Sequence, residues 1–363
     1  MKIGILGTRG IPNNYGGFEQ FAEHLSVGLV QRGHDVWVYN SHNHPFTENS
    51  WHGVNIIHRY DPEDYIGIPG QFIYDFNCIV DSRKRNFDIL LQLGYTSNSI
   101  WHRLLPERAK IVTNMDGLEW QRSKYSKPVK RFLKFAEKLA VKSSNYLIAD
   151  SEVILNYLSK TYQVPVTFIP YGADIFESAY EDALIPFKVN PREYFLIIAR
   201  MQPDNHIEEI INGVLLSKTI MPLLIVGNCR NRYGRSLRTT YESEKIRFPG
   251  PIFEKEKLNN LRYFSRLYFH GHSSGGTNPS LLEAMAASAP ICAHDNPFSH
   301  EVLGNNARYF SNASQISEMI DENQNQIVNP DFIIENIERI RFKYNWVTLI
   351  QSYETMFQKA VSN

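Results

Sequence analysis

Short apolar runs alternate along the chain with longer amphipathic segments. Runs that are apolar on both faces are typical of strands covered on both sides of a parallel sheet. These runs read KIGILGT, DVWVYN, VNIIHRY, DILLQL, KIVTNMD, YLIADS and VTFIPYG in the first half, and YFLIIAR, PLLIVGN, KIRFPG, LYFHGH, PICAHD and ARYF in the second. Between them lie segments of helical periodicity such as FEQFAEHLSVGLVQRG, VKRFLKFAEKLAVKSS and PSLLEAMAAS. The alternation predicts an α/β fold of parallel sheets with helices on both faces.

The alternation stops and restarts at the polar, Pro-containing stretch DIFESAYEDALIPFKVNPRE, and we place a linker there, near residues 175–193. The 363 residues are enough for two domains of ordinary size. We expect an N-terminal domain over 1–180 and a C-terminal domain over 188–344, both doubly wound and Rossmann-like, which face each other across a cleft. A last helix, about 345–363, is expected to pack back on the first domain.

Composition narrows the class of protein. Lys plus Arg and Asp plus Glu both number 38, so the formal charge is zero and a general nucleic-acid binder is not expected. The three cysteines show no metal-ligand spacing and are expected to be reduced thiols of a cytoplasmic protein. No apolar run reaches the roughly 18 residues of a spanning helix. Because MKIGILGT is too short for a signal-peptide core, we expect no export and at most peripheral membrane contact.

The stretch HGHSSGGTNPSLLEAMAASAP carries the first candidate chemistry. It joins a strand to a helix, so its loop lies at the carboxyl edge of the second sheet. Gly275 and Gly276 leave backbone amides unobstructed beside a helix N-terminus, which suits a diphosphate. The alternative is an ordinary turn, with Asn278 as a helix cap. Glu283 lies about one turn into the helix, where it either accepts hydrogen bonds from sugar hydroxyls or is simply exposed.

Two further loops favour a ligand with phosphate groups. GTRGIPNNYGGFEQFAEHL enters the first helix with Gly16 and Gly17, but its spacing is not the dinucleotide fingerprint. Arg200 ends a buried strand, where its guanidinium either binds a diphosphate or forms a structural salt bridge. Anion-binding helix starts on both domains predict a phosphate-containing ligand.

These loops together resemble the GT-B glycosyltransferases of family 4, a retaining class that uses nucleotide sugars. Within that family, the chain is most similar to the rhamnosyltransferase-like branch of bacterial surface-polysaccharide synthesis. The matching stretches run in family order from residue 4 to about 304. They are GTRGIPNNYGGFEQF, NMDGLEWQRSKYS, IADS, IPYGAD, ARMQPDNHIEEII, HGHSSGGTNPSLLEAMA and DNPFSHEVLG.

The resemblance implies a role for several residues and shows two departures. Arg200 matches an arginine that grips the diphosphate, but Asn205 stands where the wider family has a lysine. Glu283 matches the second of two glutamates around the donor, near the ribose or deoxyribose, but Gly275 stands in place of the first. The donor-binding set is Gly16, Gly17, Arg200, Asn205, His272, Gly275, Gly276, Thr277, Asn278 and Glu283. For His272, a strand-end histidine without contact to the ligand is the alternative.

The acceptor side is implied by NMDGLEWQRSKYS, which follows a strand of the first domain. The wider family often has a histidine beside the reacting sugar in this region, where this chain has Asp116. We expect Asp116 to contact the acceptor hydroxyl or the donor sugar, with a plain Asp-Gly turn as the alternative. Glu119 and Glu19 are the other acceptor candidates, and the catalytic residues expected are Asp116 and Arg200.

The function implied is a retaining transferase that moves a sugar, rhamnose from dTDP-rhamnose, onto a lipid-linked saccharide in polysaccharide, O-antigen or capsule assembly. The alternatives are a UDP- or GDP-sugar donor, or an inactive relative that binds sugar nucleotides. No metal and no cofactor are expected, because no Asp-x-Asp motif ends a strand. Basic residues crowd 122–142 around an apolar strip of Val129, Phe132, Phe135 and Leu139. This segment is either a solvated helix or a contact to anionic membrane at the inner face of the cell membrane.

Overall fold

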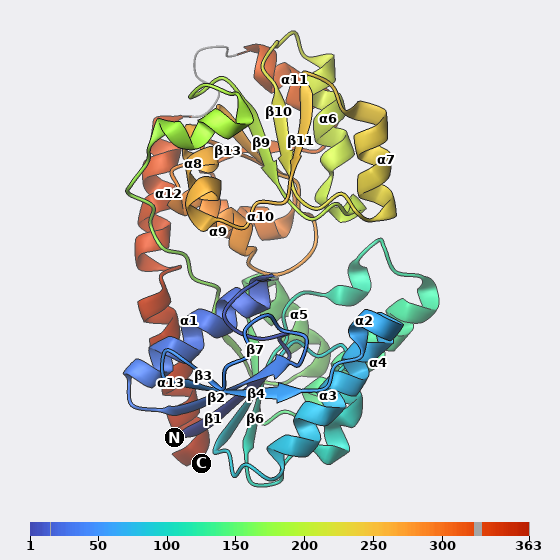
Figure 1. The fold of residues 1–363 in the computed structure, drawn as a ribbon, viewed down its shortest axis with the longest axis vertical. Helices are drawn as coiled ribbons and strands as arrows, with labels where there is room; N and C mark the ends of the chain where they lie inside the picture. Colours follow the sequence, from blue (N-terminus) through green and yellow to red (C-terminus); the bar gives the residue numbers. More distant parts are fainter. Residues whose placement is uncertain (15, 323–328, 363) are drawn as a thin grey trace. The chain divides into compact units, whose positions relative to one another are not determined.

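The computed structural model describes residues 1–14, 16–322 and 329–362. The chain divides into two compact units, which are described separately. The first unit comprises Met1–Gln121, Tyr125–Tyr171 and Trp346–Asn363, and the second comprises Arg122–Lys124 and Gly172–Asn345. Figure 1 shows the elements of both units.

The first unit is built on one sheet with strand order β3-β4-β2-β1-β5-β6-β7-β8. All neighbouring strands are parallel except the β3–β4 pair. The strands are β1 (Lys2–Leu6), β2 (Asp35–Ser41), β3 (Ser50–Trp51), β4 (Val54–Arg59), β5 (Ile89–Leu93), β6 (Lys110–Asn114), β7 (Tyr146–Ala149) and β8 (Val166–Phe168). The strand order reverses at β1, which is the place where ligands bind in such sheets.

Helices flank this sheet, and one of them comes from the end of the chain. The helices are α1 (Gly17–Gln31), α2 (Glu63–Ile66), α3 (Pro69–Ser82), α4 (Lys127–Ser143), α5 (Glu152–Tyr162) and α13 (Trp346–Ser362), with 3-10 turns η1 (Ser99–Leu104) and η2 (Glu119–Gln121). The last helix lies against the first in Figure 1. The ring of Trp346 stacks on His24 with centroids 4.2 Å apart, and Tyr353 packs on Phe21 at 5.4 Å.

The second unit is built on an all-parallel sheet with strand order β11-β10-β9-β12-β13-β14. The strands are β9 (Phe195–Ile198), β10 (Leu223–Val226), β11 (Ile246–Gly250), β12 (Leu267–His270), β13 (Ile291–His294) and β14 (Arg308–Phe310). The helices are α6 (Ile207–Leu216), α7 (Arg232–Tyr241), α8 (Lys255–Phe264), α9 (Pro279–Ala286), α10 (Pro297–Leu303), α11 (Ala313–Glu322) and α12 (Pro330–Phe342), with 3-10 turns η3 (Glu181–Phe187) and η4 (Pro203–Asn205). The order reverses at β9, so residues after β9 and β12 meet at one edge.

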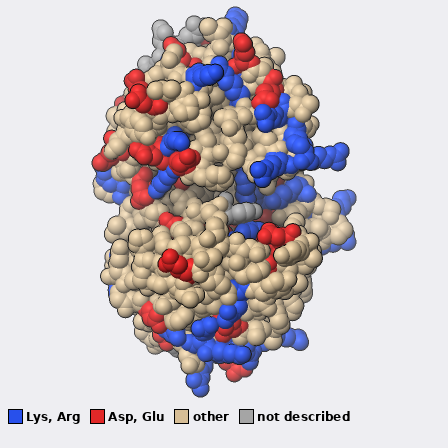
Figure 2. Space-filling model, viewed as in Figure 1, with Lys and Arg blue, Asp and Glu red and all other residues tan. Residues whose placement is uncertain are grey.

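The predicted architecture of two Rossmann-like α/β units is confirmed. The apolar residues of the central strands are buried over most of each strand, as the continuous apolar runs predict. The stretch predicted as a linker contains η3, which packs on α8, and the Tyr180 amide donates to Asn260 Oδ1 at 2.8 Å. Acidic and basic side chains are interspersed over the face shown in Figure 2. None of the helices in the described residues combines the length and the apolar character needed to cross a membrane.

Candidate functional site

The loop between β12 and α9 forms the centre of the candidate site in the second unit. Its helix begins at Pro279, and the Asn278 side chain caps it by accepting from the Ser280 amide at 2.9 Å. Gly275 has a φ of 126°, a conformation that favours glycine. A Cβ at Gly271 would lie 2.1 Å from the Asn205 carbonyl oxygen, so the loop after β12 lies directly against the turn after β9. Gly275, a predicted site residue, therefore permits the turn, and Gly271, which was not among the predicted site residues, permits the close approach.

A small pocket lies at this loop, and several polar atoms of its lining residues have no hydrogen-bond partner among the described residues. The pocket is lined by His270, His272, Ser274, Gly276, Leu281 and Phe298, among others. Among the described residues, His270 Nδ1, His272 Nδ1 and Ser274 Oγ are buried and accept or donate no hydrogen bond. Buried polar atoms are normally satisfied, so these three atoms need a partner that the described residues do not supply.

The two histidines of this pocket are neutral. Their rings stack with centroids 4.5 Å apart. Burial lowers the pKa of His270 to about 3, and the charges of Arg262 and His294 add to the effect. Burial also lowers the pKa of His272 well below its usual range, with further contributions from His270 and Arg200. Each neutral ring has one nitrogen that donates and one that accepts, which suits sugar hydroxyls as well as phosphate oxygens.

Arg200 and Asn205 lie at the same edge but have different surroundings. Arg200 follows β9 with an exposed side chain, and its charge acts on His272. Asn205 is buried, and its Nδ2 donates to the Arg200 carbonyl oxygen at 2.6 Å. The side-chain amide of Asn205 therefore binds the backbone that carries Arg200. The resemblance, in which Asn205 stands where the wider family has a lysine, did not predict this local role.

Glu283 is bound by a buried arginine. Its Oε2 accepts from Arg262 Nη2 at 2.5 Å, and the Arg262 side chain is 1% exposed. The same guanidinium donates to Asn259 Oδ1 at 2.9 Å and to Ser280 Oγ at 3.3 Å. Sequence reasoning missed Arg262, because a charged residue in an amphipathic helix reads as exposed. The pairing fixes the orientation of the Glu283 carboxylate.

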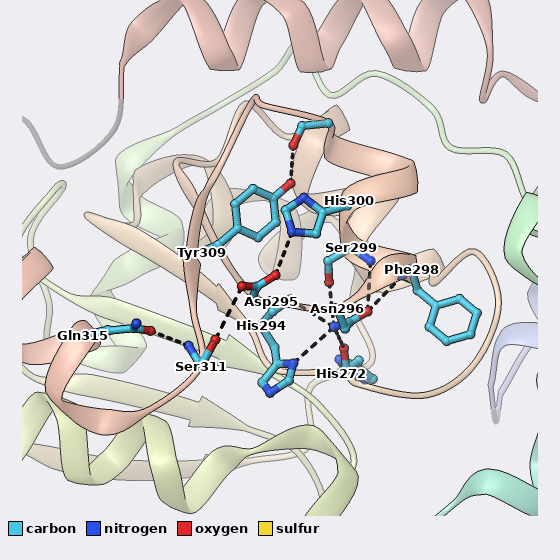
Figure 3. A network of polar contacts seen from close by, with 11 residues as sticks. His272, His294, Asp295, Asn296, Phe298, Ser299, His300, Tyr309, Ser311 and Gln315 are labelled. Atoms are coloured by element: carbon cyan, nitrogen blue, oxygen red, sulfur yellow. Dashed lines mark hydrogen bonds and ion pairs between the residues drawn. The ribbon is translucent and has the colours of Figure 1, made fainter.

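A further asparagine joins the loops after β12 and β13 (Figure 3). Asn296 Nδ2 donates to the carbonyl oxygens of His272 and His294, each at 3.0 Å. Its Oδ1 accepts from the amides of Phe298 and Ser299, so the same side chain caps α10. Asn296 was not among the predicted site residues, although the Asn-Pro pair in DNPFSHEVLG is a helix-start signal that points to it.

His206, Glu209 and His294 form a cluster of possible metal ligands in the described part of the second unit. His206 Nδ1 and Glu209 Oε2 are 2.9 Å apart and hydrogen-bond. The rings of His206 and His294 stack with centroids 3.9 Å apart and planes 27° apart. One possible ligand atom from each of the three residues lies within 4.8 Å of the other two.

In the first unit, Gly16, Gly17 and Glu19 lie where β1 leads into α1. Gly16 is the N-cap, and no side chain caps the helix. Glu19 is buried, and its Oε1 accepts from the Arg9 amide at 2.8 Å and from Thr8 Oγ1 at 3.2 Å. A Cβ on Gly16 would lie 3.4 Å from Glu19 Oε2, so an anion at this helix start would face a carboxylate. Glu19 thus holds the loop, beside the amides predicted to bind phosphate.

Asp116 and Glu119 follow β6. Asp116 has a φ of 48°, and its amide donates to Asn114 Oδ1 at 3.0 Å. Its charge, with those of Asp150 and Glu19, reaches the buried Tyr171, whose pKa is raised chiefly by burial. The negative charges of these three carboxylates therefore add to the effect of burial on the Tyr171 pKa.

The Asp116–Trp120 loop is fastened to α4 through an acid that sequence reasoning missed. Glu137 is fully buried and accepts from Trp120 Nε1 at 2.9 Å, Tyr157 OH at 2.7 Å and Tyr162 OH at 2.6 Å. Lys134 Nζ lies 3.4 Å from the Glu137 carboxylate and 4.0 Å from the centroid of the Trp120 ring. The lone acid of a basic segment is thus the buried centre of a network whose other members are half-buried.

Comparisons with known proteins place these features in context. Residues 98–174 match a family model described as a domain of unknown function, DUF1972. The chain is 25% identical over 218 residues to the O-antigen chain mannosyltransferase RfbU of Salmonella typhimurium, covering 56% of this chain. It spans only 60% of the length of that relative.

Two solved structures resemble nearly the whole chain. Sucrose-phosphate synthase from Thermosynechococcus elongatus has a TM-score of 0.79 at 14% identity, with 99% of each chain covered. Anabaena Alr3699/HepE in complex with UDP and glucose has a TM-score of 0.76 at 14% identity, again with 99% of each chain covered. The likeness confirms the predicted GT-B fold.

Proposed function

We propose that this protein is a glycosyltransferase that moves a sugar from a nucleotide-sugar donor to a saccharide in O-antigen-type polysaccharide synthesis. One observation carries the proposal: neutral, unpartnered polar atoms line the pocket at the start of α9, beside Arg200. The Salmonella relative is named as an O-antigen mannosyltransferase, and a structural neighbour was solved with UDP and glucose. Both support a nucleotide-sugar ligand for this pocket.

The proposed chemistry assigns a role to each donor-side group. Transfer breaks the bond from the anomeric carbon to the diphosphate and forms a bond from that carbon to the acceptor oxygen. Negative charge grows on the leaving diphosphate, where Arg200 and the amides near Gly276 and Thr277 stabilise it. The neutral rings of His270 and His272 bind hydroxyl or phosphate oxygens. Glu283, oriented by Arg262, accepts from the hydroxyl of the nucleotide sugar ring.

On the acceptor side we assign Asp116 the contact to the reacting hydroxyl or the donor sugar, with Glu119 and Glu19 in the surrounding set. The acceptor proton passes to an oxygen of the departing phosphate, and the anomeric configuration is retained. The reaction is proposed to need no metal ion and no cofactor, because Arg200 and backbone amides supply the positive charge.

The donor we favour is dTDP-rhamnose, as in the rhamnosyltransferase-like branch of family 4. Gly275 supports it, because it stands where members with other donors have a glutamate beside the transferred sugar. A UDP- or GDP-sugar is the second candidate, and the naming of the Salmonella relative as a mannosyltransferase favours it. An inactive relative that only binds sugar nucleotides is the third.

The acceptor is proposed to be a lipid-linked saccharide, reached from the inner face of the cell membrane, in O-antigen or capsule assembly. Support comes from α4, whose exposed side carries Lys127, Arg131, Lys138 and Lys142. Basic residues of this kind bind anionic lipid headgroups.

The donor is tested by thermal denaturation with dTDP-rhamnose, UDP-sugars and GDP-sugars over a range of concentrations. A ligand that binds the folded state raises the melting temperature with concentration. The preferred donor is then assayed for release of nucleoside diphosphate with a lipid-linked acceptor. A stabilising ligand without turnover would identify the inactive relative, and no stabilisation by any nucleotide sugar would contradict the proposed function.

Replacement of Arg200 tests the diphosphate contact. Arg200→Ala is expected to weaken donor binding about 10- to 150-fold, since a hydrogen bond to a charged group contributes about 1.5–3 kcal/mol. Calorimetric titration with the donor measures the change. Arg238→Ala, which removes an exposed arginine of α7 in the same unit, is the matched control. Equal donor affinity in both variants would show that Arg200 does not bind the donor.

A further inference from the structure

The segment between β4 and α3 exposes large apolar side chains. Tyr65 is 79% exposed, Ile68 67%, Tyr60 54%, Ile66 49% and Ile73 40%. We call these five residues the 60–73 patch. Single exposed apolar residues are common on soluble proteins, whereas several together mark a surface that binds a protein or a membrane.

Contacts with neighbouring residues hold the backbone that carries the patch. Gly67 has a φ of 70°, and a Cβ on Gly70 would lie 2.4 Å from the Glu63 amide nitrogen, so α2 and the start of α3 are in close contact. Arg9 binds the Glu63 carboxylate through both Nη2 at 2.7 Å and Nε at 3.0 Å. The α2 helix buries none of its own residues. The turn is thus tied to Arg9 and to α3, while its apolar side chains stay exposed.

The patch adjoins the basic helix α4 within the first unit. The ring of Phe72, in α3, packs on Phe132, in α4, with centroids 5.8 Å apart. Phe135 is exposed on the same face of α4 as Arg131 and Lys138, four residues before it and three after it. Asp64 is the exposed acid of the α2 turn, and Glu63 is paired with Arg9. The neighbouring surface thus combines exposed apolar groups with an excess of positive charge.

We propose that the 60–73 patch and the exposed side of α4 together form a docking surface for an anionic lipid bilayer. The apolar side chains of the patch enter the boundary between headgroups and acyl chains, while the basic side chains of α4 bind lipid phosphates. The inference rests on the proposed function in one respect: an enzyme whose acceptor is lipid-linked must reach the membrane. Positive charge beside the patch favours the membrane over a neutral protein partner.

Insertion is tested by placing an environment-sensitive NBD fluorophore on single cysteines in a Cys229→Ser background. Cys78 and Cys292 are buried and are not expected to react. Tyr65→Cys and Ile68→Cys carry the probe on the patch. Ile220→Cys carries it on the second unit, where Ile220 is 94% exposed, as a matched control.

With phosphatidylglycerol-containing vesicles, the probes at 65 and 68 are expected to brighten severalfold, to shift to the blue and to be quenched by nitroxide-labelled acyl chains. The probe at 220 is expected to stay unchanged. No response at 65 and 68, or an equal response at 220, would overturn the proposal. A response that depends on protein concentration without vesicles would also overturn it, since a second copy would then cover the patch.

A second pair of variants tests the energetic role of the patch with no probe attached. Tyr65→Ser with Ile68→Ser is expected to lower vesicle partitioning at least 10-fold while leaving the melting temperature unchanged, because both side chains are already exposed. These measurements need neither donor nor turnover. Vesicle binding without nucleotide-sugar binding would therefore reject the proposed function alone, and the reverse result would reject the docking surface alone.

Discussion

At the scale of single residues, the pair of Glu283 and Arg262 determines how the site responds to mutation. Removing one partner of a buried ion pair leaves an uncompensated charge, which typically costs about 3–5 kcal/mol. Glu283→Ala is therefore expected to lower the free energy of unfolding by about this amount, because the Arg262 side chain is almost fully buried. Chemical denaturation measures the change.

The double variant Glu283→Ala with Arg262→Met separates this cost from any role in donor binding. It removes both charges, and it is expected to recover much of the lost stability while donor binding stays weak. Recovery of donor binding along with stability would show that Glu283 serves the fold alone. Stability equal to that of the single variant would show that the pair contributes little.

His270 makes stability depend on pH. Its pKa is lowered to about 3 in the folded protein, against about 6.5 in the unfolded chain, so the unfolded state binds more protons below pH 6.5. The stabilising effect of the neutral ring is complete above pH 6.5 and is lost as the pH falls towards 3, by about 1.4 kcal/mol per pH unit. Denaturation of the wild type and of His270→Gln between pH 5 and pH 7 tests this.

The slope with pH, rather than the absolute stability, is the readout, so an overall loss of stability in His270→Gln does not obscure the result. Other groups titrate in the same range. Asp75, whose pKa burial raises to about 7, gives the opposite slope. Because those groups are common to both proteins, the difference in slope isolates His270. Identical slopes would contradict a neutral buried ring.

At the scale of elements, the strands and most helices could be predicted because local pattern determines them. The strand FLII is apolar at every position and its first three residues are buried, and Asn278 followed by Pro279 marks the start of α9. The α4 helix shows the limit of this reasoning. Val129 and Phe135 of the predicted apolar strip are exposed, while Leu133, Ala136, Glu137 and Ala140 are buried.

The reason for the difference is that the partners of Glu137 lie far away in the sequence. Tyr157 and Tyr162 belong to the α5 segment, and Trp120 belongs to the loop before α4. Nothing local distinguishes a carboxylate with three such donors from one in water. Arg262 was missed for the same reason. Glycine and strand-end patterns predict the candidate loops. The buried residues that bind these loops, Glu137 and Arg262, are seen only in the structure.

The Glu137 network predicts a strong effect of one substitution. Glu137→Ala leaves three half-buried donors and Lys134 without their buried acceptor, and it is expected to cost about 3–5 kcal/mol of stability. Glu137→Gln keeps an acceptor oxygen and is expected to cost less. Lys138→Ala, the adjacent exposed residue of the same helix, is the control and is expected to change stability by no more than about 0.5 kcal/mol. If Glu137→Ala matched Lys138→Ala, the network would be unimportant for stability.

At the scale of the whole molecule, the formal charge is zero, so any attraction to an anionic membrane depends on where the charges lie. The structure also selects which basic residues are suitable for the test. Lys134 lies over the Trp120 ring and pairs with Glu137, so its reversal would disturb the buried network. Lys127, Arg131, Lys138 and Lys142 are exposed along α4 and do not have this complication.

Reversing these four residues to Glu is expected to release the protein from anionic vesicles at moderate salt, since each basic residue near such a surface contributes about 1 kcal/mol. Vesicle sedimentation measures the bound fraction. The matched control reverses Arg230, Arg232, Arg235 and Arg238, exposed residues in and beside α7, which gives the same net charge. If both variants lost binding equally, net charge alone would explain it. If neither did, α4 would be an ordinary solvated helix and the lipid-linked acceptor would lose its support from this surface.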